Sequence, residues 1–260
     1  MTLAQEKKED FAKSVAAFVS SLSPPLIEWQ RIAGYAQWAC YTVPLAKFAL
    51  KPLYPKMVGK KLRNAPVPIN KDVKTNLRWF AEKILDAPPL FLLDPCLDEW
   101  KAKDADMVYY TDACLVSNNG ASGLGFWTRS SSGKILDYFF RASTPLDDIQ
   151  LAEALAVTSA LNHAINSIPR PSRVLVFTDS APSVYAFDAG RGSSALIKLV
   201  WRTFEKLEEA NIDLRIKHIA GSTNPRADKL SRLHPSELAA NFSSLSSFAP
   251  PAWALGGESE

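Results

Sequence analysis

The order of strand-forming and helix-forming segments between residues 107 and 233 most strongly limits how this chain can fold. Three runs of β-branched and aromatic residues follow one another closely, separated by turn residues, and predict an antiparallel meander. An alanine-rich segment then predicts a long helix over 148–165. A strand, two helices, a strand and a final helix follow. We expect an α/β fold with a mixed five-stranded sheet flanked by helices, its strands at 107–112, 123–127, 134–141, 173–178 and 213–219.

The first hundred residues have a different pattern, of helices separated or broken by proline. Apolar residues recur at helical spacing over 5–22, 26–50 and 71–85. A Pro-Pro pair near residue 88 and a stretch of mixed charges beyond it indicate a boundary. We therefore expect a mainly helical region at 1–100, an α/β domain at 101–235, and a flexible C-terminal tail, rich in Ser, Ala and Pro, at 236–260.

Positive charge is concentrated in the N-terminal region, although the whole chain carries a formal charge of only +3. Between residues 47 and 83, ten Lys and Arg residues face only Asp72 and Glu82. A one-sided basic stretch of this kind favours contact with phosphates; an ordinary solvated surface is the alternative.

Several classes of protein do not fit this sequence. The three cysteines are odd in number and widely separated, which argues against a disulfide framework or a zinc site. No run of about 18 apolar residues is present, and the first ten residues are charged where a secretory signal would be apolar. We expect an intracellular protein, cytoplasmic or nuclear, without a membrane partner.

Acidic residues stand where strands of the predicted sheet end. Asp112 and Asp179 each follow a threonine at the end of a predicted strand, and the carboxyl ends of adjacent parallel strands meet at one edge of a sheet. Glu153 lies on the helix between them, and Asp228 follows the last strand. Clustered carboxylates repel unless cations lie among them, and oxygen ligands suit Mg²⁺. Two ions about 3.5–4 Å apart are typical of phosphoryl-transfer sites.

Four segments, taken together, resemble the motifs of type 1 ribonuclease H: YYTDA at 109–113, EALA at 153–156, TDS at 178–180 and ADKLSR at 227–232. The resemblance implies a ribonuclease H-like fold and endonucleolytic hydrolysis of the RNA strand of RNA–DNA hybrids. It also implies Mg²⁺ as cofactor, with Mn²⁺ as a substitute. The residues implied as both catalytic groups and metal ligands are Asp112, Glu153, Asp179 and Asp228.

The upstream segment EWQRIAGYAQWA at 28–39, with KPLY at 51–54, is similar to the thumb and connection region of retroelement reverse transcriptases. The similarity is greatest to fungal elements of the DIRS-like group. The paired-aspartate motif of a polymerase palm is not in this chain, so polymerase activity is not expected. This resemblance implies binding of an RNA–DNA hybrid or another nucleic acid, for which we select Lys56, Lys60, Lys61 and Arg63.

Two alternatives belong to other functional classes. A catalytically silent nucleic-acid-binding protein would bind without Mg²⁺-dependent cleavage, and a structural module derived from a reverse transcriptase fragment would respond to neither divalent ions nor hybrid. Neither histidine near the acids enters the expected catalytic set. We expect His218, in the last predicted strand, to be structural, and His163 to lie on the surface of the long helix.

Overall fold

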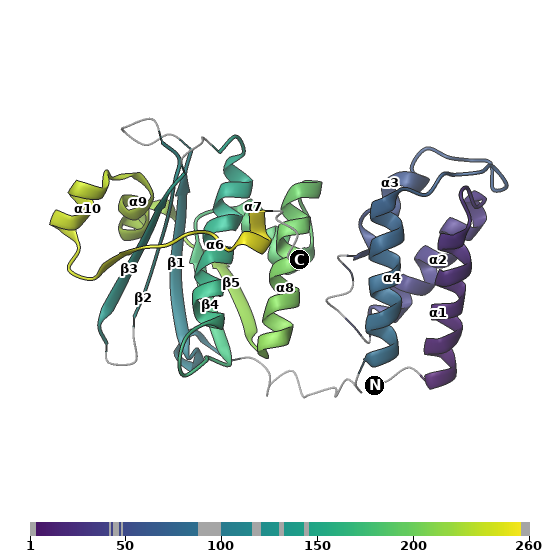
Figure 1. Cartoon of the computed structure of the whole chain (residues 1–260), viewed down its shortest axis with the longest axis horizontal. Coiled ribbons are helices and arrows are strands. Elements are labelled where there is room, and N and C mark those ends of the chain that lie inside the picture. Colours follow the sequence, from purple (N-terminus) through teal and green to yellow (C-terminus); the bar gives the residue numbers. More distant parts are fainter. Residues whose placement is uncertain are drawn as a thin grey trace. The chain divides into compact units, whose positions relative to one another are not determined.

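The computed structural model describes residues 4–41, 43, 47, 49–87, 100–115, 121–129, 133–142 and 146–255. The chain divides into two compact units, Met1–Asp98 and Glu99–Glu260, each shown in Figure 1. Among the described residues, no helix has the length and apolar character needed to cross a membrane.

The first unit is helical. It contains α1 (Gln5–Ser20), α2 (Leu26–Ala39), the short α3 (Tyr54–Met57) and α4 (Lys71–Asp86). Its core is aromatic: Phe11 meets Phe80 edge to face, and Phe18 meets Trp29 in the same way, at 5.4 and 5.2 Å between ring centroids. The helix expected over 26–50 ends at Ala39, before Pro44.

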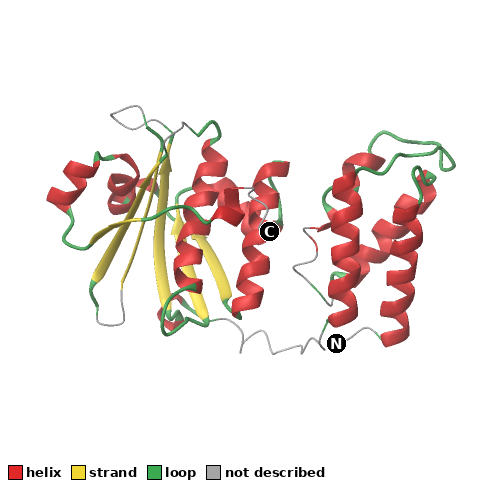
Figure 2. Ribbon diagram, in the orientation of Figure 1, coloured by secondary structure: helices red, strands yellow, loops and turns green. Residues whose placement is uncertain are grey.

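The second unit is built on a six-stranded sheet with the order β5-β4-β1-β2-β3-β6. Strands β1, β2 and β3 form the expected antiparallel meander, while β4 pairs in parallel with β1, and β5 with β4 (Figure 2). The sheet therefore mixes both strand directions, as expected from the order of elements. The strand bounds are β1 (Met107–Cys114), β2 (Gly123–Arg129), β3 (Ile135–Arg141), β4 (Arg173–Thr178), β5 (Asp213–His218) and β6 (Leu245–Ser247).

Helices cover both faces of this sheet (Figure 1). Helix α6 (Ile149–Ile165) packs on β1 and β2, and α8 (Ser194–Ala210) packs on α6. Alanines at many buried positions of α6 let it approach the sheet closely. The short α7 (Ala181–Ala189) follows β4. On the other face, α9 (Pro225–Arg232) packs across β1, β2 and β3, and α10 (Pro235–Asn241) follows it.

The C-terminal segment differs from the flexible tail expected from its composition. Its described residues form most of α10, the sixth strand β6, and the 3₁₀ turn Ala252–Leu255. Phe248 packs on Phe126 and Phe140 of the sheet, and the Trp253 carbonyl accepts a 2.9 Å hydrogen bond from Arg202 of α8. These contacts join residues that are far apart in the sequence, so the local pattern of the C-terminal segment did not predict them.

His163 also differs from expectation, because it is not on the surface of α6. Its Nδ1 lies 2.7 Å from the Tyr109 hydroxyl and its Nε2 lies 2.8 Å from the Tyr138 hydroxyl. Burial lowers the pKa of this imidazole. The sheet buries this side of the helix, so a polar residue there needs internal partners.

Candidate active site

Three of the four predicted acids come together at one edge of the sheet. Asp112 lies near the end of β1, Asp179 directly follows β4, and Glu153 lies in the second turn of α6. The register of the parallel pair, with Thr111 opposite Thr178, brings the two aspartates side by side. One carboxylate oxygen from each of the three acids lies within 4.8 Å of the others.

Burial makes this cluster unfavourable when every carboxylate is ionised. Asp112 is 3% exposed and Glu153 is 8% exposed. Burial, and then the charges of Asp179 and Asp228, raise the pKa of Asp112 to about 7, although the Ser231 hydroxyl opposes the shift. Burial, and then the charges of Asp112 and Asp179, raise the pKa of Glu153 to about 9.

The donor set fits a hard divalent cation. All three groups offer oxygen, which Mg²⁺ prefers to nitrogen or sulfur. Oε2 of Glu153 is buried and has no hydrogen-bond partner among the described residues, so it is an unsatisfied acceptor in the cluster. A cation among these oxygens would satisfy that atom and offset the mutual repulsion of the carboxylates.

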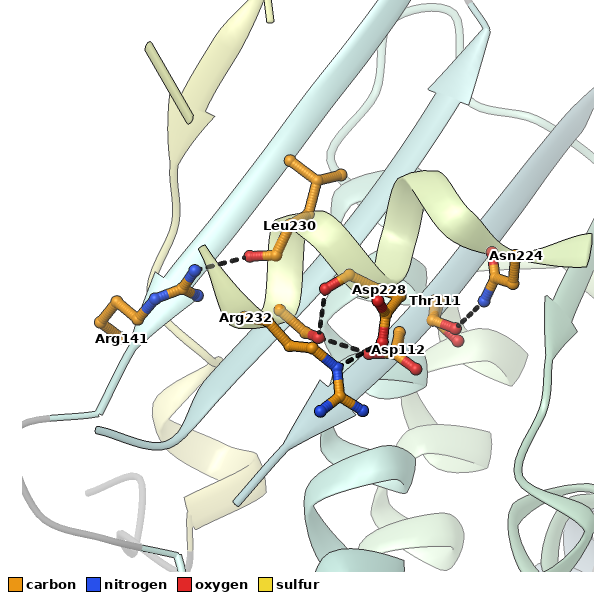
Figure 3. A network of polar contacts seen from close by, with 8 residues as sticks. Thr111, Asp112, Arg141, Asn224, Asp228, Leu230 and Arg232 are labelled. Atoms are coloured by element: carbon orange, nitrogen blue, oxygen red, sulfur yellow. Dashed lines mark hydrogen bonds and ion pairs between the residues drawn. The ribbon is translucent and has the colours of Figure 1, made fainter. Parts of the chain in front are cut away.

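Asp228, the fourth predicted acid, lies beside this group and not within it. It is on α9, 43% exposed, and its Oδ1 pairs with Nε of Arg232 one turn later (Figure 3). It is close enough to Asp112 to raise the pKa of that carboxyl. The hydroxyl of Ser231 joins the two acids, because it hydrogen-bonds to Oδ2 of Asp112 and lies 2.9 Å from the Asp228 carbonyl.

Two glycines of β2 let α9 lie directly on the sheet. A Cβ at Gly125 would lie 2.5 Å from Cβ of Leu230 and 2.7 Å from the Ser231 nitrogen. A Cβ at Gly123 would overlap the Ser231 carbonyl. Only glycine permits this approach, which brings Ser231 within reach of Asp112.

His218, for which the sequence predicted a structural role, lies next to the acids. Thr178 pairs with His218 in the parallel β4–β5 ladder, and Nε2 of His218 lies 3.1 Å from the Asp179 carbonyl. The imidazole is exposed, and its contact is with the backbone that carries Asp179.

The four predicted nucleic-acid-binding residues belong to the first unit. Lys60, Lys61 and Arg63 are exposed, and Lys56 is partly buried at the end of α3. Residues 58–70, between α3 and α4, form the basic loop. Its backbone carbonyls hold the start of α2: the Arg63 carbonyl accepts from the Ile27 N–H at 2.9 Å, and the Ala65 carbonyl accepts from the Leu26 N–H at 3.0 Å. The role of the four basic side chains in binding nucleic acid stays a prediction.

Residues 110–234, just under half of the chain, match the family model described as Reverse transcriptase-like. A search of curated proteins found none that matches. Among solved structures, RNase H1 of the halophilic archaeon Halobacterium salinarum NRC-1 is 20% identical, covering 52% of this chain and 98% of its own, with a TM-score of 0.38. LC11-RNase H1, isolated from compost by a metagenomic approach and solved with an RNA/DNA hybrid, is 23% identical, covering 48% of this chain and 92% of its own, with a TM-score of 0.41.

The fold class expected from the sequence is confirmed by the chain's own topology. An antiparallel meander is followed by a helix and two parallel strands, which gives the expected mixed sheet flanked by helices, with β6 as a sixth strand beyond the five expected. The described part of the first unit is helical, as expected.

Proposed function

We propose that the second unit is a metal-dependent ribonuclease H that hydrolyses the RNA strand of RNA–DNA hybrids by endonucleolytic cleavage. We further propose that the chain derives from a retroelement reverse transcriptase, with the first unit corresponding to the thumb and connection region. Mg²⁺ is the expected cofactor, and Mn²⁺ is expected to substitute for it.

One observation supports this function most strongly: oxygens of Asp112, Glu153 and Asp179, from three separate elements, gather within 4.8 Å. The order of these acids along the chain is that of the ribonuclease H motifs to which the sequence is similar. Two of them are buried, and a buried group of like charges is costly unless it serves a ligand.

Each acid has a distinct proposed role. Asp112 belongs to the cluster with Glu153 and Asp179 and is also close enough to Asp228 for that charge to raise its pKa, so it would help to hold a cation together with acids of either group. Glu153 and Asp179 would hold one cation with it, and Asp228 the other. A bound pair of divalent cations activates a water and stabilises the leaving 3′ oxygen in phosphoryl transfer.

The remaining groups act around that centre. His218, exposed beside Asp179, is placed to exchange protons with solvent at the edge of the site. Glu153 would also face the ribose 2′-hydroxyl, the group by which a protein distinguishes RNA from DNA. The hybrid would be held mainly through its backbone, with Lys56, Lys60, Lys61 and Arg63 contributing phosphate contacts, so little sequence preference is expected.

The test is cleavage of a labelled RNA–DNA hybrid by the full chain with Mg²⁺, compared with the Asp112→Asn variant. We expect RNA fragments from the wild-type protein, none without metal, and a loss of several orders of magnitude in the variant. Duplex DNA of the same sequence is the substrate control. Hybrid binding without cleavage by the wild-type protein would contradict the proposal.

A further inference from the structure

Helix α9 carries Asp228 and Ser231, yet it has only eight residues and few internal hydrogen bonds to hold it in place. The position of these two side chains therefore depends on what fixes α9 to the sheet. Figure 3 shows contacts from other elements at both of its ends.

At the start of the helix, Asn224 joins α9 to β1. Its Nδ2 donates a 2.9 Å hydrogen bond to the carbonyl of Thr111, the residue that precedes Asp112. This side chain is 2% exposed, so solvent does not compete for the bond. The beginning of α9 is thus tied to the strand that carries Asp112.

At the other end, Arg141 of β3 donates to backbone carbonyls that the helix leaves unsatisfied. Its Nη2 donates to the carbonyl of Leu230 at 2.9 Å, and also to the carbonyl of Leu233. Its Nη1 donates to the Phe140 carbonyl at 2.9 Å. Three backbone oxygens thus accept hydrogen bonds from this one guanidinium.

This position suits arginine better than lysine. The last carbonyls of a helix carry partial negative charge, and a cation there is favourable. The planar guanidinium offers several donors in fixed directions, whereas the ammonium of lysine cannot match that geometry. Gly123 leaves room for it, because a Cβ at that glycine would lie 2.5 Å from Nη1.

We propose that Arg141 is a positioning residue for the metal site: by fixing the end of α9, it holds Ser231 and Asp228 against Asp112. This rests on the proposed function, since it assigns α9 to the second cation. In this proposal Arg141 does not contact the substrate. Asp112, Glu153 and Asp179 lie on or next to other elements, so Arg141 acts on the cation that they would hold only through the Ser231 bond to Asp112.

The test compares wild-type protein with Arg141→Lys, which keeps the charge and loses the fork of donors. The matched control is Arg129→Lys, at an exposed position on the neighbouring strand β2. Calorimetry with Mg²⁺ or Mn²⁺ should show a divalent-ion affinity lowered by about 10–100-fold in Arg141→Lys, the usual effect of removing a partner that orients metal ligands. Hydrogen exchange should become faster in α9 and stay unchanged in α6.

In the cleavage assay, Arg141→Lys should need about 10–100-fold more Mg²⁺ for half-maximal rate, with KM for hybrid nearly unchanged. A purely structural role predicts a lower Tm with unchanged metal dependence, and that result would overturn the proposal. If the wild-type protein does not cleave hybrid, the proposed function fails, while calorimetry and exchange still test Arg141.

A wild-type measurement covers the case in which Arg141→Lys does not fold. The coupling between metal binding and the position of α9 is reciprocal. If packing of α9 on the sheet favours metal binding, metal binding must favour the packing of α9 on the sheet. Exchange of the α9 amides in the intact protein should therefore slow when Mg²⁺ is added. Unchanged exchange at saturating Mg²⁺ would overturn the proposal.

Discussion

The hydroxyl of Ser231 on α9 hydrogen-bonds to Oδ2 of Asp112 on β1, two residues that are 119 positions apart in the chain. This bond favours the ionised form of Asp112 and so opposes the rise in its pKa caused by burial. Ser231 thus lowers the pH at which the carboxylate becomes available to a cation.

Replacing Ser231 with alanine should therefore raise the pKa of Asp112 further. A hydrogen bond to a charged group contributes about 1.5–3 kcal/mol, which corresponds to about one to two pKa units. We expect the acidic limb of the pH–rate profile of hybrid cleavage to move to higher pH by that amount. Ser246→Ala, at an exposed position of β6, is the control. An unmoved profile in Ser231→Ala would show that this bond does not tune the site.

The metal-free protein should lose stability as pH rises. The folded-state pKa values of Asp112 and Glu153, about 7 and about 9, lie above those of the unfolded chain. At a pH between the unfolded-state and the folded-state pKa of each group, the folded state binds more protons than the unfolded state. The free energy of unfolding therefore falls as pH rises. Denaturant titrations from about pH 5 to about pH 9 should show this decline, and Mg²⁺ should reduce it.

The matched control for this decline is Asp112→Asn combined with Glu153→Gln, because amides of the same shape do not titrate. The double variant should show a much flatter dependence on pH over the same range. An equally steep decline in the double variant would place its origin outside the acid cluster.

Gly125→Ala should disturb α9 more than its size suggests. The new methyl would meet Cβ of Leu230 at 2.5 Å and the Ser231 nitrogen at 2.7 Å, so helix and sheet must separate. Overpacking of this kind costs about 1–3 kcal/mol of stability. We expect a lower Tm and a loss of cleavage at fixed Mg²⁺. Gly34→Ala in α2, where a methyl meets nothing within 4 Å, should leave cleavage unchanged.

The sequence predicted a cluster of four acids, and the three that the structure groups within 4.8 Å are those whose geometry follows from local pattern. Thr-Asp at the ends of two strands places Asp112 and Asp179 together once β1 and β4 are parallel neighbours. The place of Asp228 could not be derived in that way. It depends on the glycines of β2 and on Arg141 of β3, and their contacts with α9 have no local signature in the sequence.

The sequence did not predict the elements that the described residues 236–255 form, for a related reason. Composition and weak periodicity describe how a segment behaves alone, and here the segment is ordered by its partners. Ser246 pairs with Tyr138 of β3, and Phe248 contacts Phe126. These interactions form only when the sheet exists, so the local pattern of residues 236–260 does not predict them.

His218 is expected to support turnover and not binding. Replacement by alanine should lower kcat by about 10²-fold, the lower end of general acid–base effects, with hybrid affinity retained. His218→Gln is the discriminating variant, because its amide nitrogen at the ε position can still donate to the Asp179 carbonyl but does not titrate. If His218→Gln kept the full kcat and the wild-type pH profile, the histidine would have only a structural role.

The basic loop of the first unit should supply affinity without affecting the chemical step. Lys60 and Lys61 are exposed, and the loop is anchored to α2 through the Arg63 and Ala65 carbonyls. If both lysines bind phosphates, Lys60→Gln with Lys61→Gln should weaken hybrid binding for every sequence. The slope of log affinity against log salt should flatten by about 0.7–0.9 for each lysine–phosphate ion pair that the substitutions remove. Replacing Lys56 and Arg63 as well should weaken binding further.

The matched control is Lys7→Gln with Lys13→Gln, which removes two exposed lysines from α1 of the same unit and leaves the loop intact. Fluorescence anisotropy of labelled hybrid across a salt series, without metal, measures both double variants. Saturated turnover with Mg²⁺ should be equal in all three proteins, because these lysines lie on the unit that does not carry the carboxylates. Equal slopes for the two variants would mean that the basic loop is a solvated surface, and the second unit would then have to bind its hybrid alone.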